Sequence, residues 1–292
     1  MNKVFHILSA SMIILAIITS ALGLFYTTNG QSYDFVNQYG DIVKIYGNGI
    51  YKNDSYFMAP IFKGTDCTIL FLVIPLFIFA LVKDVKKNTV KTKLFLTTLV
   101  SLFAYYSTSI CFGVTYNVLH LLYIALFSCS IFALFIGFTV LKNSDLKISV
   151  NICTVGLKIF LVFSGLSLFV AWLPDIMQSL INGKSLGLIE IYTTQITYVL
   201  DMGIISPLIF ICLYNLTKFK SIGYILLAII LQMIIIVGIM VIIQAVFQIM
   251  AGIDLPIGVF ITKIGIFVLM ALVAIFYNLK LIKNLQVSKK DI

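Results

Sequence analysis

The chain has 292 residues, of which 61% are hydrophobic and 11% charged, with a mean hydropathy of +1.10 and a formal net charge of +9. Soluble domains carry about 25% charged residues, so this composition excludes a soluble globule and predicts a polytopic membrane protein. No nucleic-acid partner is expected, because the basic residues fall in short loops rather than on one clustered face. All 20 are lysines, a bias that suggests an AT-rich bacterial genome.

Eight apolar runs are predicted to cross the bilayer, since a hydrocarbon core of about 30 Å needs about 20 apolar helical residues. They cover residues 4–26, 66–82, 94–112, 117–141, 152–173, 197–216, 222–250 and 256–279. The first run is longer than the roughly 7–15 apolar residues of a signal peptide, so it is retained as a span. The expected fold is all-α, a transmembrane bundle of about eight helices.

The lysines predict the orientation, because Lys and Arg near span ends are retained on the cytoplasmic side. With the N-terminus inside, fourteen of the twenty lysines fall in cytoplasmic segments. The two long outer segments, residues 27–65 and 174–196, hold only Lys44, Lys52, Lys63 and Lys184. We therefore expect a multi-pass protein of the bacterial cytoplasmic membrane with both termini in the cytoplasm.

The first outer segment contains "YGNGIYKNDSY", in which Gly47-Asn48-Gly49 can supply positive φ for the tight turn of a short hairpin. Asp54 or Ser55 can cap a brief amphipathic helix after it, and Asp66 can then cap the second span. We expect this segment to be a lid over the bundle, or alternatively a tyrosine-rich collar at headgroup level. The lid residues are Tyr46, Gly47, Gly49, Tyr51 and Asp54.

The spans that follow the two outer segments are alike. Each opens with aspartate (Asp66, Asp201), carries proline within it (Pro75, Pro207) and ends in lysine. This similarity predicts two parallel four-helix repeats, residues 1–150 and 151–292. The alternative is convergence, because any inward-running helix can begin with an aspartate cap and end in lysine.

The stretches "YGNGIYKNDS", "TYNVLHLLYIALFS" and "DMGIISPLIF" resemble parts of a group of uncharacterised bacterial multi-span membrane proteins. The similarity extends over most of the chain. It implies the multi-span architecture and no particular activity.

Polar side chains inside the spans are costly in hydrocarbon and are first interpreted as functional. Several of them, from different spans, share one depth near the outer side, and Lys263 could pair there with Asp201, Asp66 or Asp254. Alternatively, the aspartates only cap helices, the glutamines bond neighbouring helices and His120 is a satisfied core histidine. The preferred interpretation is an outward-facing polar cavity lined by Asp66, Tyr116, Asn117, His120, Asp201, Gln244, Gln248 and Lys263.

The sequence has no zinc-ligand motif, nucleophile signature, Walker sequence or dinucleotide fingerprint, so neither a metal nor a cofactor is predicted. The expected function is binding of a small molecule, lipid headgroup or ion, as in a secondary carrier. One alternative is an enzyme acting on a lipid of the outer leaflet, which needs two acid–base groups within hydrogen-bond reach. Another is a subunit that binds a partner protein, which predicts a filled bundle interior.

Overall fold

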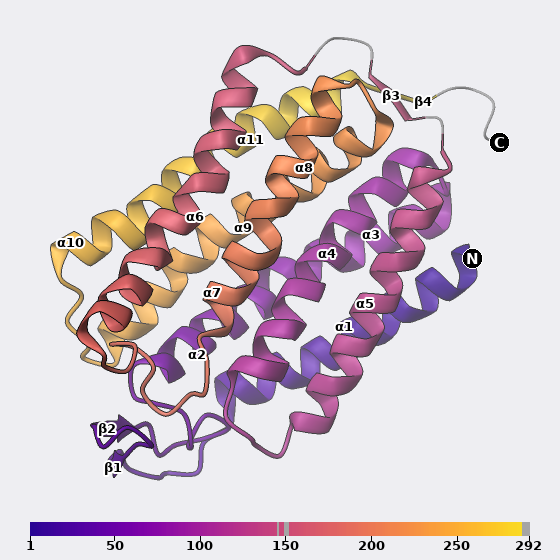
Figure 1. Cartoon of the computed structure of the whole chain (residues 1–292). Helices are drawn as coiled ribbons and strands as arrows, with labels where there is room; N and C mark the ends of the chain where they lie inside the picture. The colour runs from indigo at the N-terminus through magenta and orange to yellow at the C-terminus, as the bar shows by residue number, and fades with distance from the viewer. Residues whose placement is uncertain (145, 149–151, 288–292) are drawn as a thin grey trace.

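The computed structural model describes residues 1–144, 146–148 and 152–287 and shows the predicted all-α bundle (Figure 1). Within these residues, eight helical segments are long and apolar enough to cross a membrane. The first four are α1 (Asn2–Phe25), α2 (Met58–Thr68) with the π-helical turn η1 (Ile69–Val73) and α3 (Ile74–Lys87), α4 (Val90–Gly113) and α5 (His120–Lys142). The last four are α6 (Val155–Asn182), α7 (Ile196–Leu200) with η2 (Asp201–Ile205) and α8 (Ser206–Thr217), α9 (Ser221–Met250), and α10 (Ile257–Val259) with η3 (Phe260–Gly265) and α11 (Ile266–Asn284).

Two small antiparallel sheets lie at opposite ends of the bundle. Strand β1 (Tyr33–Val36) pairs with β2 (Ile42–Ile45) between α1 and α2, and β3 (Leu146–Ile148) pairs with β4 (Leu285–Val287). Figure 1 shows the first hairpin at one end and the N-terminus, β3 and β4 at the other. We call these the hairpin end and the termini end.

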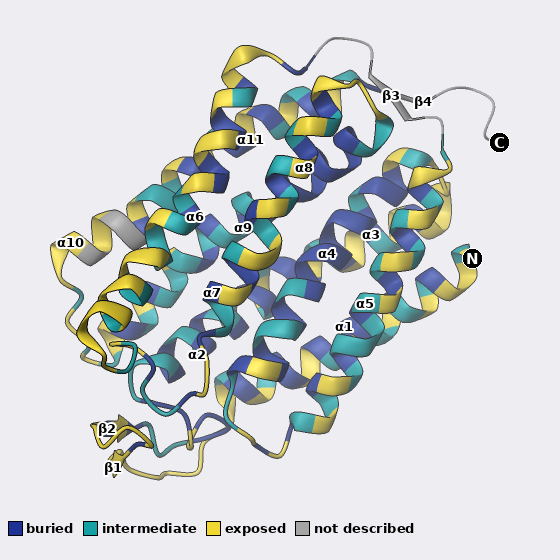
Figure 2. Cartoon of the chain, viewed as in Figure 1, coloured by how far each residue is buried: buried dark blue, intermediate teal, exposed yellow. Residues whose placement is uncertain are grey.

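Helices α4 and α9 form the centre of the bundle. In their most apolar stretches 78% and 61% of the residues are buried, compared with at most 39% in the other six spans. Figure 2 shows buried residues concentrated on these two helices and exposed residues on the outward sides of the others. Exposed side chains such as Ile14, Phe79 and Phe135 suit hydrocarbon, so the outer surface fits a lipid environment.

The helices of the two halves pack in a similar order. Helix α4 packs on α3 and α5, and α9 packs on α8 and α11, while α2 contacts α9 and α7 contacts α4 across the bundle. The second span of each half contains a π-helical turn followed directly by a helix with proline in its first turn, Pro75 in one half and Pro207 in the other. When the two π-helical turns are aligned, Asp201 corresponds to Ile69 rather than to Asp66. The division into residues 1–150 and 151–292 stays a prediction.

The second span begins at Met58, earlier than predicted, so the expected amphipathic helix is the first part of the span itself. Pro60 lies in the first turn of α2, where backbone N–H groups have no partner within the helix, so the N–H that proline lacks is not needed there. Gly64 lets α2 lie against the backbone of α9, because a Cβ at this position would lie 2.6 Å from the Cα of Gln244. Ser55 Oγ accepts a hydrogen bond from Met58 N at 3.1 Å, whereas Asp66 lies inside the span and caps nothing.

Two further boundaries differ from the prediction, whereas the sixth span begins at Ile196, one residue before its predicted start. Asp201 therefore lies inside this span instead of opening it. Helix α6 continues through Pro174 to Asn182, and it ends where Gly183 adopts the left-handed conformation at φ 60°. His120 is the first residue of α5 instead of lying one turn inside the span. Pro174 therefore does not end α6, and Asp201 does not start its helix.

A buried ion cluster joins α1, α3 and α4 at the termini end. Lys93 Nζ donates to Asp84 Oδ2 at 2.6 Å, and His6 Nε2 lies 2.7 Å from the same oxygen. Thr92 Oγ1 donates to Asp84 Oδ1 at 2.7 Å. The Asp84 side chain is fully buried and that of Lys93 is 4% exposed, so each charge depends on the other to offset its loss of solvent.

Candidate functional site

Two segments that are far apart in sequence meet at the hairpin end. They are the hairpin segment, residues 26–57, and the α6–α7 segment, residues 183–195. Asn37 Nδ2 donates to the Glu190 carbonyl at 2.7 Å, and Gln38 Nε2 donates to the Tyr192 carbonyl at 3.1 Å. The predicted lid therefore rests on a second segment as well as on the helices.

The predicted turn residues do not form the turn of the hairpin. That turn is formed by residues 37–41, which lie between β1 and β2. Gly47 and Gly49 do have positive φ angles, 80° and 69°, as predicted. A Cβ on Gly47 would lie 1.9 Å from the Gln31 carbonyl oxygen, and one on Gly49 would lie 2.5 Å from that of Tyr26. The two glycines therefore let the chain cross the start of its own segment.

Tyr51 inserts from the hairpin segment into the bundle and reaches Asp66. Its side chain is 1% exposed, and its hydroxyl donates to Asp66 Oδ2 at 2.5 Å. Tyr106 of α4 donates to Asp66 Oδ1 at 2.9 Å. A Cβ on Gly23 of α1 would lie 2.0 Å from Asp66 Oδ2, so only glycine leaves room for the carboxyl group. Burial raises the pKa of Tyr51 well above its ordinary value, which keeps its hydroxyl a donor.

Asp201 is held by a separate set of donors. Tyr105 of α4 donates to Asp201 Oδ1 and Trp172 Nε1 donates to Oδ2, both at 2.9 Å. The indole of Trp172 stacks on Tyr198 with ring centroids 4.7 Å apart. The consecutive residues Tyr105 and Tyr106 of α4 thus bind Asp201 and Asp66. Within the described part of the chain, neither aspartate forms an ion pair.

Asp54 joins three connecting segments at the hairpin end. It is fully buried, and its Oδ1 accepts hydrogen bonds from Thr115 N at 2.9 Å and from the Tyr192 hydroxyl at 3.0 Å. Its Oδ2 is buried and accepts no hydrogen bond from the residues that the structure describes. Burial raises the pKa of Asp54 to about 7. Next to it, Ser55 Oγ donates to Glu190 Oε2, and burial raises the pKa of Glu190.

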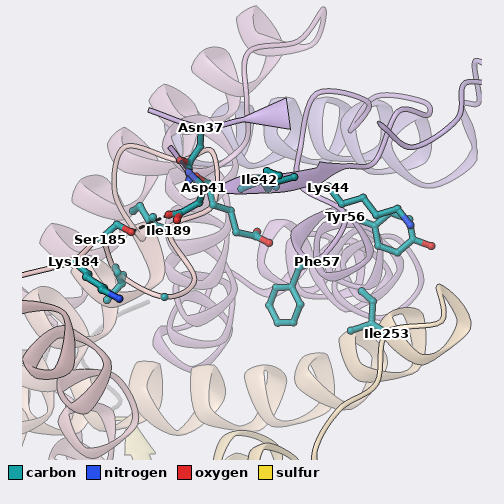
Figure 3. A pocket seen from close by; sticks show the side chains of 14 residues that line it. Asn37, Asp41, Ile42, Lys44, Tyr56, Phe57, Lys184, Ser185, Ile189 and Ile253 are labelled. Carbon is teal, nitrogen blue, oxygen red and sulfur yellow. Dashed lines mark hydrogen bonds between the residues drawn. The ribbon is translucent and has the colours of Figure 1, made fainter. Parts of the chain in front are cut away.

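A pocket of about 540 Å³ lies between the hairpin segment and the α6–α7 segment (Figure 3). In Figure 3 Lys184 and Ser185 lie on one side of it and Lys44 and Tyr56 on the other, with Phe57 and Ile253 below. Lys44 Nζ lies 4.4 Å from the ring centroid of Tyr56. The charged residues of the lining are Lys44, Lys184, Asp41 and Glu190. A second pocket of about 280 Å³ shares Lys184, Ser185 and Gly187 with it.

The two predicted glutamines bond the second span. Gln244 Nε2 donates to Thr65 Oγ1 at 2.7 Å, and Gln248 Nε2 donates to the Phe57 carbonyl at 3.3 Å. The first contact joins α9 to α2, and the second joins α9 to the residue just before α2. Both agree with the alternative that the glutamines bond neighbouring helices.

The remaining predicted residues lie around the start of α5 and in η3. Asn117 Oδ1 accepts from Leu119 N at 2.9 Å, which orders the turn before the helix. Tyr116 is 77% exposed and its ring lies 5.4 Å from that of His120. Lys263 belongs to η3, but its side chain lies outside the described residues. None of the eight residues predicted to line a cavity lines either of the two pockets described above.

Several residues of the hairpin end were missed from the sequence. Tyr105 and Tyr106 lie within the predicted apolar span 94–112, where a pair of tyrosines indicates a buried acceptor. Glu190 is the only glutamate of the chain. A single glutamate in a short polar stretch could have indicated a functional residue. Its contact with the hairpin segment could not be predicted from the sequence.

No protein-family model, curated protein or solved structure matches this chain. The resemblance to an uncharacterised group of membrane proteins therefore stays a prediction.

Proposed function

We propose that this multi-pass membrane protein binds a small polar molecule at its hairpin end. The observation that supports the proposal is the pocket of about 540 Å³ with two lysines and two carboxylates in its lining. As far as the structure describes the chain, none of these four residues is in an ion pair. Pockets of roughly 300–1,000 Å³ with a few convergent polar groups are typical of small-molecule sites.

The hairpin end is proposed to face outward. Support comes from Lys86 and Lys87 in the last turn of α3, Lys142 in that of α5 and Lys283 in that of α11, which all belong to the termini end. In a variant without the native cysteines, Asn53→Cys should react with a membrane-impermeant maleimide on intact cells. Asn88→Cys should react only after permeabilisation, and the opposite pattern would reverse the orientation.

A carrier function is a second candidate, and Asp66 and Asp201 favour it. Both lie in the spans and next to π-helical turns, in the half of the bundle nearer the hairpin. Ionisable groups at such depth mark ion or proton pathways in many transporters. Reconstituted protein should then move protons together with the bound molecule, and Asp66→Asn should retain binding but stop the proton flux.

The packed interior favours binding at the end of the bundle over an open path through it. Phe77 and Phe103 are fully buried, with ring centroids 4.8 Å apart, and Tyr123 is 1% exposed. A filled interior is also what a partner-binding subunit predicts. The four exposed residues of β1, among them Phe35 and Val36, offer a surface for such a partner. A lipid-directed enzyme is less favoured, because no hydrogen bond joins Asp66 to Asp201 within the described residues.

Calorimetry on protein in dodecyl maltoside micelles, whose headgroup is uncharged, tests the proposal. The probes are glycine, ethanolamine, acetate and glycerol 3-phosphate. At least one of them should bind the wild-type protein and the Lys52→Met control, whose exposed lysine lies outside the pocket lining. Glu190→Gln or Lys44→Met should weaken that binding at least tenfold. Absence of binding by these four probes and also by glycerophosphoethanolamine and glycylglycine, or binding that both pocket variants leave unchanged, would refute the proposal.

A further inference from the structure

We infer that the pocket at the hairpin end takes a small zwitterion, in which an amine and a carboxylate or phosphate belong to one molecule. The inference rests on the proposed function and adds the chemical class of the ligand. It is based on the four charges of the pocket, on the conformation of Glu190 and on the arrangement of the apolar wall.

The two lysines and two carboxylates of the pocket lining have a net charge of zero, and none of them forms an ion pair within the described residues. Lys44 and Lys184 are exposed, Asp41 accepts a hydrogen bond from the Ser185 hydroxyl at 3.2 Å, and Glu190 accepts one from a serine. A ligand with one charge would be attracted by one pair of residues and repelled by the other. A ligand with both charges can place its ammonium against Glu190 and its acidic group against Lys44, both in the pocket lining.

Glu190 is the group best placed to bind the amine. Its backbone lies in the left-handed region at φ 47°, which is unfavourable for a residue with a side chain. Two contacts with the hairpin segment hold it there, from Asn37 to its carbonyl and from Ser55 to Oε2. Among the described residues no donor bonds Oε1, so this oxygen can accept one of the three N–H groups of an ammonium.

Lys44 is placed to bind the acidic group. The ring of Tyr56 holds the Lys44 ammonium at the pocket wall by a cation–π contact. The Tyr56 hydroxyl in turn donates to the Ala251 carbonyl at 2.8 Å, which fixes the ring. Phe57 and Ile253 provide an apolar surface for the carbon atoms between the two charged ends of the ligand.

Two sources could supply this chemistry, a free amino acid or peptide and a zwitterionic lipid headgroup. Matched probes separate them. Glycerophosphoethanolamine is compared with ethanolamine, which keeps its positive charge, and with glycerophosphoglycerol, a phosphodiester that keeps its single negative charge. Glycylglycine is compared with glycylglycine amide and N-acetylglycylglycine in the same way. Binding is measured by calorimetry at pH 7.5 in dodecyl maltoside micelles, whose uncharged headgroup does not compete with a zwitterion.

The zwitterion of at least one set should bind at least tenfold more tightly than both of its singly charged partners. Glu190→Gln, which can still accept from Ser55, should weaken the zwitterion and the cation but not the anion. Lys44→Met should weaken the zwitterion and the anion but not the cation. Preference within the phosphate set indicates a headgroup, and preference within the glycine set indicates a free solute.

The inference fails if a singly charged probe binds as tightly as its zwitterion and is still weakened by a pocket variant. That result would leave the proposed function intact and change only the class of ligand. If no probe binds, or if neither pocket variant alters binding, the proposed function itself fails. Melting temperatures of both variants are compared with Lys52→Met, so that a loss of folding is not counted as a loss of binding.

Discussion

Replacing Asp54 with asparagine should make the protein more stable at alkaline pH. Asparagine keeps an oxygen that can accept from Thr115 N and Tyr192, as Asp54 Oδ1 does now. It also removes a negative charge that is fully buried. The variant therefore separates the cost of the charge from the loss of the hydrogen bonds.

The magnitude follows from the pKa of Asp54, which burial raises from 3.8 to about 7. Because the native state holds the proton more tightly than the unfolded state, this carboxyl group contributes most stability below pH 3.8, and the contribution is lost as the pH rises to about 7. At 1.36 kcal/mol per pKa unit, the whole effect is about 4 kcal/mol, and the part between pH 5 and pH 8 is roughly 2–3 kcal/mol.

The assay is thermal unfolding in one detergent at pH 5 and pH 8. Asp54→Asn should raise the melting temperature relative to wild type at both pH values and by several degrees more at pH 8. Asp34→Asn is the matched control, because Asp34 is exposed on β1. If Asp54→Asn changed the melting temperature equally at both pH values, the buried charge would not be the cause.

Three other substitutions probe the spans by the same melting assay. Gly23→Ala should lower stability by about 1–3 kcal/mol, because the new Cβ would lie 2.0 Å from Asp66 Oδ2. Tyr106→Phe should cost about 1–3 kcal/mol, because it removes one of the two hydroxyl donors of Asp66 and keeps the ring. Asp84→Asn should cost about 3–5 kcal/mol, because it leaves the Lys93 charge buried without its partner.

The controls for these substitutions lie in the same chain. Gly187→Ala places a methyl group in open space and should leave the melting temperature nearly unchanged. Tyr116→Phe alters a tyrosine that is 77% exposed and should have little effect. Equal losses in test and control variants would contradict the contacts assigned to Gly23 and Tyr106. For Asp84→Asn, a further Lys93→Met change should recover part of the stability, and a further loss would contradict the pairing.

The eight spans could be predicted because apolar length alone decides whether a helix can cross a bilayer. Their ends were less predictable. Asp66 and Asp201 are good capping residues in isolation, but the helices start before them because the preceding residues pack on α9 and α4. Tertiary packing therefore outweighed the capping preference of the two aspartates. Pro174 likewise does not end its helix, because α6 continues to Asn182.

The site was predictable only in part. The polar character of the hairpin end and the positive φ angles of Gly47 and Gly49 followed from residue types. The partner of the hairpin did not, because Asn37 and Glu190 are separated by 153 positions and no local pattern links them. The cavity residues were chosen for common depth, but depth does not say which side of a helix a residue occupies, and Gln244 points toward α2.

The donors of Asp66 and Asp201 differ in when the ribosome makes them. Tyr51 precedes Asp66 by 15 residues, but Tyr106 follows it by 40, so this carboxyl group enters the translocon with half of its final shell still unmade. Trp172 and Tyr105 precede Asp201 by 29 and 96 residues, so its complete shell already exists when it emerges. Nascent chains stopped shortly after the second span should therefore be the ones that a membrane quality-control protease degrades first.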